Sequence, residues 1–214
     1  VNEWNQADLM TLLNSGAYYN RTNGTCYNSA SNATTSCDFS ENSTTPGLTN
    51  EAKEMIGNAK WYLGAHTTNY VTTSDMYGYE RSTASGKQCT QNNNLCSDSV
   101  MRKTNWIGQI GLMYPSDYGY SANMTSCSST TLYDYQTSCK DSAWLYNSTT
   151  TQWTLSPYAN SSLAGSVFYV ISTGTFNTNF AGIAFGVSPV TYLKSDIKIV
   201  DGVGTDQQPF KLSK

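Results

Sequence analysis

Apolar side chains recur at helical spacing in two segments of the chain. Residues 4–14 place their tryptophan and leucines on one helical face, and Gly16 follows as a stop signal. In the second segment, Thr49 can cap a helix whose apolar positions continue toward Leu63, with Gly64 available to end it. The pattern therefore predicts two amphipathic helices.

Two further regions have the alternation or the β-branched and aromatic residues that are typical of strands. Residues 107–114 alternate until Pro115 stops them, and residues 166–200 contain short apolar runs broken by Gly and Asn. These regions predict one small, twisted antiparallel sheet. Residues 65–105 and 116–143 hold few apolar side chains, so we expect irregular chain at the surface there. The combination is an α+β domain with long loops.

The composition narrows the classes of partner. The chain has 214 residues, which fits a single domain over residues 1–214. Only 13% of the residues are charged, the net charge is −3 and no basic run occurs, which disfavours nucleic acid as a partner. No stretch approaches the roughly 20 apolar residues that span a bilayer. Because the sequence starts at Val1 and shows no signal peptide, we expect a mature or trimmed chain.

Six cysteines indicate the compartment. They fall into three local pairs in polar segments, which is typical of disulfides formed in an oxidising, extracellular space. The pairing of neighbours rests on proximity, because six cysteines allow many other connectivities. A zinc site is the alternative, but it needs tighter spacing and more than the one histidine present. The predicted disulfides are Cys26–Cys37, Cys89–Cys96 and Cys127–Cys139.

Residues 158–183 combine strand-like runs with the composition of a recognition surface. Tyr, Asn and Ser provide contact area and adaptable hydrogen bonding at modest entropic cost. If Phe168 and Val170 point inward, period-two alternation turns Tyr169 and Ile171 outward. Surface aromatics also occur without a function, but their clustering on a disulfide-stapled scaffold favours binding. The predicted ligand-binding residues are Tyr158, Asn160, Tyr169, Ile171, Asn177, Asn179 and Phe180.

The sequence predicts no catalytic residue, metal or cofactor. His66 is the single histidine, and it follows a helix end in a polar stretch, where it caps carbonyls or faces water. Glu80, Arg81 and Asp117 stand in otherwise uncharged segments, which favours structural ion pairs over an acid–base site. The glycine-rich residues 201–206 carry two aspartates but match no calcium loop, so we expect a turn.

A set of short motifs resembles a known family. In order over residues 48–212, the chain reads TNEAKEMIGNAKWYLG, YER, WIGQIGLMYPSDYGYSA, AWL, WTLSP, VFYV and GVSPVTYLKSDIKI. These motifs are similar to those of uncharacterised bacterial surface domains that are common in gut Gram-positive bacteria. The resemblance implies a C-type-lectin-like fold, shared with formylglycine-generating enzymes and retroelement-diversified proteins. It also makes residues 1–47 an N-terminal helix-and-loop extension of a core over residues 48–212.

The resemblance also bears on activity. Formylglycine-generating enzymes use reactive cysteines, and no cysteine here occupies the late core block where one would be expected. The sequence triplets of calcium-dependent sugar-binding lectins are absent as well. The family usually has Arg where Ser188 stands, so this chain lacks one buried ion pair that the resemblance implies.

Together these features predict a non-enzymatic extracellular recognition or adhesion module of a bacterial cell surface. It would bind a glycan or a protein through residues 158–183. The alternative is a structural subunit of a surface filament, pilus or layer, whose partners are copies of itself. Exposed Trp and Tyr side chains on two distinct faces would favour the alternative, because they would support head-to-tail contacts.

Overall fold

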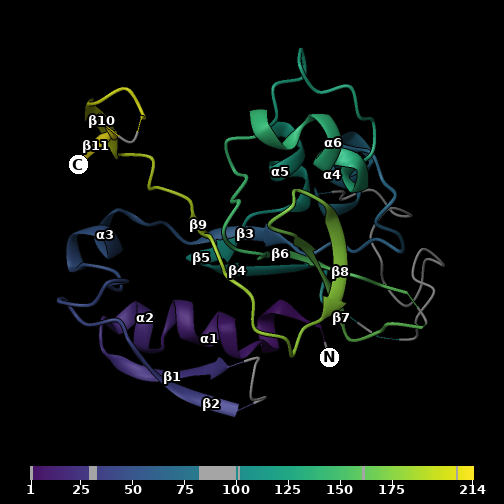
Figure 1. Cartoon of the computed structure of the whole chain (residues 1–214). Coiled ribbons are helices and arrows are strands. Elements are labelled where there is room, and N and C mark those ends of the chain that lie inside the picture. The colour runs from purple at the N-terminus through teal and green to yellow at the C-terminus, as the bar shows by residue number, and fades with distance from the viewer. Residues whose placement is uncertain (1, 29–32, 82–99, 101, 161, 206) are drawn as a thin grey trace.

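The computed structural model of the protein describes residues 2–28, 33–81, 100, 102–160, 162–205 and 207–214. Over these residues the chain is a mixed α/β protein with small antiparallel sheets, arranged as Figure 1 shows. The predicted mixture of helices, antiparallel strands and long loops is confirmed at this level. The predicted single sheet is wrong, because the strands divide into one three-stranded and several two-stranded sheets within the described part of the chain.

The three-stranded sheet separates two hydrophobic cores. Its strands, in spatial order, are β6 (Gln152–Pro157), β7 (Ser166–Val170) and β8 (Phe176–Phe180). The central strand is buried on both faces: Phe168 and Val170 pack into the first core, and Tyr169 packs into the second. A strand covered on both faces needs a continuous apolar run rather than an alternating one. This explains the sequence VFYV over residues 167–170.

The N-terminal segment belongs to the second core. Trp4 and Leu13 are buried there beside Trp61 and Trp153. The helix predicted over residues 4–14 is present but interrupted, because Ala7 has an extended backbone. The elements of this segment are η1 (Trp4–Gln6), α1 (Asp8–Asn14) and α2 (Ala17–Asn20).

In the described ranges, four antiparallel strand pairs complete the β structure. The strand predicted over residues 107–114 divides at Gln109, and its two halves pair with different partners. The Asn14 side chain holds this break: its Oδ1 accepts a hydrogen bond from the Ile110 backbone N–H (3.0 Å), and its Nδ2 donates to the Ile110 carbonyl (2.9 Å). The pairs are β1 (Asn23–Asn28) with β2 (Ala33–Asp38), β3 (Ala59–Tyr62) with β4 (Asn105–Gly108), β5 (Ile110–Leu112) with β9 (Pro189–Thr191), and β10 (Lys198–Asp201) with β11 (Lys211–Ser213).

The second predicted helix is shorter than its pattern indicates. Helix α3 (Asn50–Met55) begins as expected, because Thr49 Oγ1 accepts a hydrogen bond from the Ala52 backbone N–H at 3.1 Å. The predicted continuation toward Leu63 is wrong, since residues 59–62 form β3. Strand pairing places Trp61 opposite Trp106 and buries it in the second core, and this tertiary burial outweighs the helical spacing.

Several helices lie in segments that the sequence predicted to be irregular. The expectation of two helices is therefore too low for the described residues. These helices contain few apolar residues, because a few buried side chains on one face are enough to pack a helix against the first core. In α4 the buried residues are Thr73, Met76 and Glu80, and Met76 belongs to that core. Figure 1 shows α4, α5 and α6 gathered on one side of the sheet. The elements are α4 (Thr73–Arg81), α5 (Pro115–Ser121), η2 (Leu132–Asp134), α6 (Tyr135–Ser138) and η3 (Lys140–Ser142).

The expected structural ion pairs are confirmed, and they join α4 to α5. The Arg81 guanidinium donates to Glu80 and to Asp117, each at 2.9 Å, and lies 3.9 Å from the centre of the Tyr114 ring. The Ser116 backbone N–H donates to Glu80 Oε1 at 3.1 Å. Complete burial raises the pKa of Glu80 to about 8, because the charged carboxylate loses its hydration.

Two of the predicted disulfides are confirmed. Cys26–Cys37 joins the strands β1 and β2, and Cys127–Cys139 ties the chain after α5 to the end of α6. The predicted pair Cys89–Cys96 lies outside the described residues. The sequence separations of 11 and 12 residues make both confirmed bridges local constraints.

Candidate functional site

The end of β6 presents the first part of the predicted recognition surface. The backbone N–H of Tyr158 donates to the Ser166 carbonyl at 3.0 Å, which continues the pairing of β6 with β7. The half-buried Tyr158 ring packs edge-on against Phe168, with 5.3 Å between ring centres. Asn160, also half-buried, follows on the outgoing loop. Strand pairing therefore fixes the position of Tyr158, and Asn160 follows two residues later.

A loop that the sequence analysis did not select, residues 66–70, completes this surface. Its start is fixed where the Ala159 backbone N–H donates to the His66 carbonyl at 2.9 Å. The Asn160 side chain then donates from Nδ2 to the Thr67 carbonyl at 3.3 Å. The loop therefore runs beside the end of β6, although about 90 residues separate the two segments in sequence.

The same loop reaches the edge strand β8. Asn69 Nδ2 donates to Asn177 Oδ1 at 3.1 Å, so two amide side chains from distant segments form a pair. Next to this pair, the Tyr70 side chain is 60% exposed. Its ring centre lies 4.3 Å from that of the half-buried Tyr133, with the planes tilted by 30°. Tyr133 belongs to η2, which is held to the loop where the Leu132 backbone N–H donates to the Val71 carbonyl at 2.9 Å.

These contacts define one site, which we call the amide–tyrosine surface. Four segments contribute to it: the loop between β3 and α4, η2, the chain that leaves the end of β6, and the edge strand β8. Asn69 and Tyr70 are of the same residue types, Asn and Tyr, that marked residues 158–183 as a recognition surface. This was the signal in the sequence that could have identified the loop. The surface consists of Thr67, Asn69, Tyr70, Tyr133, Asn160 and Asn177.

Other predicted residues lie elsewhere. The expectation that Tyr169 faces outward is wrong: its side chain is only 8% exposed, because β7 is covered on both faces. Ile171 is half-buried and packs against the second core. Asn179 is half-buried on β8, and Phe180 is 54% exposed beside Gly165. A role of these four residues in binding stays a prediction.

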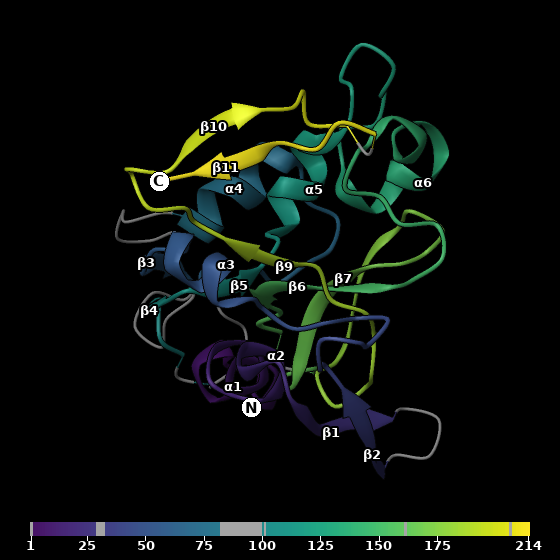
Figure 2. The same ribbon diagram turned by 90° about the vertical axis from the view of Figure 1, so that its left-hand side faces the viewer.

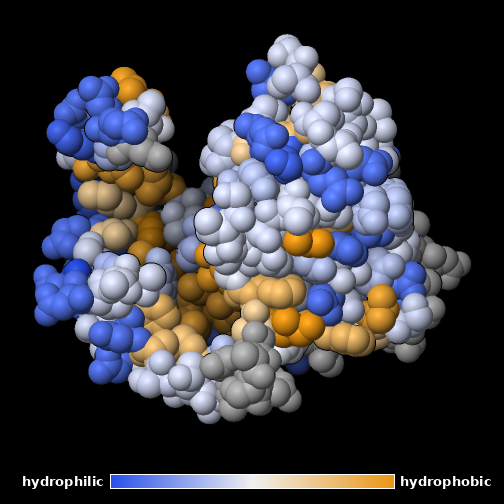
Figure 3. Space-filling model, viewed as in Figure 1, coloured by the Kyte–Doolittle hydropathy of each residue, from blue (hydrophilic) through white to orange (hydrophobic). Residues whose placement is uncertain are grey.

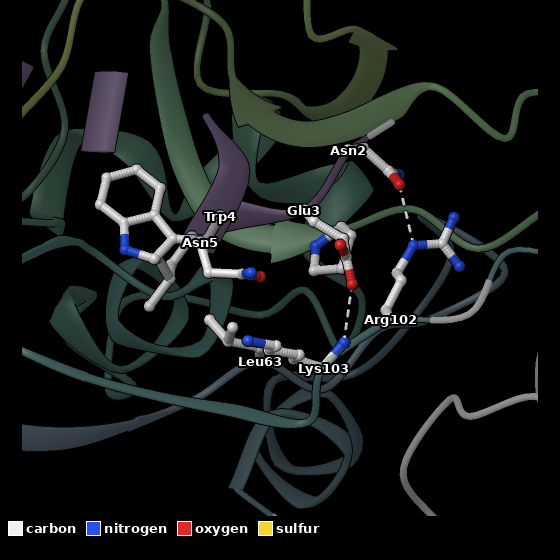
Figure 4. Close-up of a pocket in the computed structure, with 9 residues that line it drawn as sticks. Asn2, Glu3, Trp4, Asn5, Leu63, Arg102 and Lys103 are labelled. Carbon is white, nitrogen blue, oxygen red and sulfur yellow. Dashed lines mark hydrogen bonds between the residues drawn. The ribbon is translucent and has the colours of Figure 1, made fainter. Parts of the chain in front are cut away.

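A buried polar clamp joins the chain that leaves β6 to the start of β7, next to the site. Asn2 Nδ2 donates to the Tyr158 carbonyl at 2.9 Å and also to the Ser166 carbonyl. Arg102, also buried, donates from Nε to Asn2 Oδ1 at 2.8 Å and from a terminal nitrogen to the Ala164 carbonyl at 3.3 Å. Figure 4 shows the Asn2–Arg102 contact together with the cavity beside it. That cavity measures about 10 Å³, the space of roughly one water molecule, so it offers no ligand site.

The electrostatics of the amide–tyrosine surface are those of neutral groups. Burial lowers the pKa of His66, so its imidazole is uncharged at neutral pH. The side-chain hydrogen bond with Tyr133 raises the pKa of Tyr70, which keeps that phenol protonated. Among the residues that the structure describes, no group of three His, Cys, Asp or Glu side chains could hold a metal ion. Neutral hydrogen bonding and aromatic contact are therefore what this surface can provide.

The glycine-rich segment near the C-terminus is a turn, as predicted. Gly202 and Gly204 have positive φ angles of 88° and 79°, which a residue with a side chain adopts only with strain. Asp201 pairs with Lys211 at 2.7 Å across the hairpin. The second aspartate, Asp206, lies outside the described residues.

A second surface feature is an apolar groove between the C-terminal hairpin and the rest of the protein. Figure 3 shows a hollow with hydrophobic walls there, in contrast to the mostly polar surface over the lobe that carries the central sheet. Its volume is about 290 Å³. The groove is lined by Tyr18, Leu48, Ala52, Met55, Ile56, Ile110, Pro189, Thr191, Leu193 and Leu212.

Comparisons of this chain with protein-family models, with curated proteins and with solved structures found no match. Within the described ranges, none of the helices has the length and apolar character needed to cross a bilayer. The two disulfides fit an extracellular protein.

Proposed function

We propose that this chain is a non-enzymatic extracellular recognition module that binds its ligand through the amide–tyrosine surface. One observation carries the proposal: three asparagine side chains and an exposed tyrosine converge from segments that are distant in sequence. The buried Asn2–Arg102 clamp supports the chain next to this surface. A surface pre-organised in this way loses little entropy when it binds, which is the usual design of a binding site on loops.

The finer assignment of fold and source belongs to the same proposal. We assign the chain to the bacterial surface domains with a C-type-lectin-like fold, because its ordered motifs over residues 48–212 resemble theirs. The small antiparallel sheets, long loops and local disulfides of this structure are compatible with that assignment. Ligand binding by the retroelement-diversified proteins of that fold supports recognition over catalysis.

The test of the function uses a variant with Tyr70→Ala, Asn160→Ala and Asn177→Ala combined. Capture of ligands on an array that carries both glycans and host-surface proteins should be lost. The melting temperature should fall by no more than about 6 °C, because Tyr70 is exposed and neither Asn160 nor Asn177 is fully buried. Tyr27→Ala is the matched control, since Tyr27 is an exposed tyrosine on the distant strand β1. Unchanged capture by the triple variant would show that binding, if any, uses another surface.

A second candidate function is self-assembly into a surface filament or layer. The hairpin β10–β11 stands apart from the central sheet in Figure 2, and an isolated two-stranded hairpin is only marginally stable. An exposed ion pair, Lys214 Nζ to Glu54 Oε2 at 2.9 Å, links it to α3 but contributes little. We call this hairpin and its connecting turn the arm (residues 198–213). Exposed apolar side chains on the arm of one copy and the apolar groove of another would suit head-to-tail contacts. The exposed arm residues are Ile199, Val200, Val203 and Phe210.

Sedimentation over a range of concentrations separates this candidate from the first. If copies assemble through the arm, the double variant Ile199→Asp and Val203→Asp should abolish the larger species. Met124→Asp is the control, because Met124 is equally exposed but lies outside the arm. A wild-type chain that stays monomeric at high concentration, without filaments in negative-stain images, would rule out assembly.

A further inference from the structure

We infer that the ligand of the amide–tyrosine surface is an uncharged sugar: the Asn69–Asn177 pair holds two adjacent hydroxyls, and Tyr70 stacks on the apolar face of the sugar ring. This inference rests on the proposed function and names the class of ligand. It follows from the hydrogen-bonding groups that remain open, from the aromatic side chain beside them and from the sign of the surrounding charge.

The first step is the hydrogen-bond inventory of the two amides. Asn177 Oδ1 accepts from Asn69 Nδ2 at 3.1 Å and from the Thr178 backbone N–H at 2.9 Å, so both of its lone pairs are used. Within the described residues, Asn69 Oδ1 and Asn177 Nδ2 make no such bond. The pair therefore offers one acceptor and one donor side by side. Two neighbouring hydroxyl groups match this arrangement, because one can donate to the amide carbonyl of Asn69 while the other accepts from the amide N–H of Asn177.

The aromatic side chain beside the pair suits the rest of a sugar ring. Tyr70 follows Asn69 directly and exposes 60% of its surface. Its ring is supported from one side by Tyr133, 4.3 Å away, which restricts the orientation of the exposed face. The face of an aromatic ring carries partial negative charge and attracts the slightly positive C–H groups of a pyranose. The Asn69–Asn177 pair thus matches the hydroxyl groups at the edge of a sugar ring, and the aromatic ring of Tyr70 matches its apolar face.

The charge near the surface disfavours anionic ligands. Two acidic side chains act on groups at or beside it: Asp75 acts on His66, and Asp134 acts on Tyr70. An acidic sugar, a sulfated glycan or a phosphopeptide would meet repulsion here. None of the six residues of the surface is basic. The complementary ligand is therefore neutral.

The size of the apolar part disfavours a protein as the ligand. A stable protein interface buries about 800 Å² on each partner, with an apolar centre. Here Tyr70 is the exposed apolar element, and Tyr133 is half-buried behind it. One or two sugar rings cover such a site completely. Affinity then depends on a few well-placed contacts, as is usual for small ligands.

The experiment measures binding of the full chain to an array of uncharged pyranosides and to a duplicate array treated with periodate, which cleaves adjacent diols. Wild type and Tyr70→Phe should bind the untreated array, because both keep the aromatic face, and neither should bind the treated one. Tyr70→Ala and Asn177→Asp should each lose at least about tenfold, or about 1.4 kcal/mol. Asn177→Asp keeps an acceptor for Asn69 and Thr178 but replaces the amide donor with a carboxylate oxygen, which cannot donate to a sugar hydroxyl.

The outcomes separate this inference from the function on which it rests. The inference is overturned if the wild type binds no uncharged glycan. It is also overturned if binding survives periodate treatment, or if binding survives in Tyr70→Ala and in Asn177→Asp. If a protein ligand is instead captured by wild type and lost in these variants, the proposed recognition surface stands and only its ligand class is wrong. If no ligand responds to any variant, both fail. Circular dichroism of each variant verifies folding, and Tyr70→Ala, at an exposed position, keeps the test valid if Asn177→Asp unfolds.

Discussion

Replacement of Tyr169 by Ala tests the central feature of this fold, a strand (β7) that is buried on both faces. The Tyr169 ring lies 5.7 Å from that of Trp153 and 5.0 Å from that of Phe185, and its side chain is 8% exposed. Truncation of a buried aromatic to Ala costs about 3–5 kcal/mol, because the transferred surface and the cavity both contribute. For a domain of this size such a loss lowers the melting temperature by roughly 6–20 °C. We expect Tyr169→Ala to fall in this range.

The assay is urea unfolding with the disulfides intact, followed by tryptophan fluorescence and near-ultraviolet circular dichroism. Tyr169→Phe keeps both ring contacts, so it should remain within about 1 kcal/mol of wild type. Phe180→Ala removes an aromatic side chain that is 54% exposed on the neighbouring strand and should cost much less. If Tyr169→Ala and Phe180→Ala unfold at the same urea concentration, Tyr169 is not a core residue and the two-core description of β7 is incorrect.

Three further predictions follow from buried or covalent contacts. Burial raises the pKa of Glu80 from 4.5 to about 8, so the stability that Glu80 contributes is complete below about pH 4.5 and is lost as the pH rises toward 8. Glu80→Gln should therefore remove the fall in the free energy of unfolding between pH 5 and pH 9, measured by urea unfolding. An unchanged pH dependence would contradict the assignment. Asn2→Ala should cost about 1–3 kcal/mol, since it leaves the Tyr158 carbonyl without the Asn2 donor and leaves the Ser166 carbonyl with the Tyr158 backbone N–H alone. It should also accelerate amide hydrogen exchange over residues 158–166, and exchange as slow as in wild type would argue against the clamp. Replacement of Cys127 and Cys139 by Ser should lower the free energy of unfolding by about 3 kcal/mol, as expected for a loop of this length, and a loss below about 1 kcal/mol would show that the chain is constrained there by other contacts.

Local features of this protein could be predicted from the sequence alone. Neighbouring cysteines in polar segments indicated Cys26–Cys37 and Cys127–Cys139, because two thiols about a dozen residues apart meet easily in any folded loop. The helix start at Thr49 follows from a side chain that satisfies its own backbone three residues on. The mixed α/β class follows from the two periodicities of the apolar residues. Each of these depends on residues that are close in the chain.

Only the tertiary structure decided which side chains are buried and which meet at the site. Trp61 continues a helical pattern but pairs with β4, because burial against distant residues outweighs a propensity of a few tenths of a kcal/mol. Tyr169 is buried although alternation predicts exposure, since cover on the second face of β7 comes from elements far away in sequence. The Asn69–Asn177 pair joins residues 108 positions apart. Short-range patterns carry no information about such contacts, because they depend on how the packed elements are placed relative to one another.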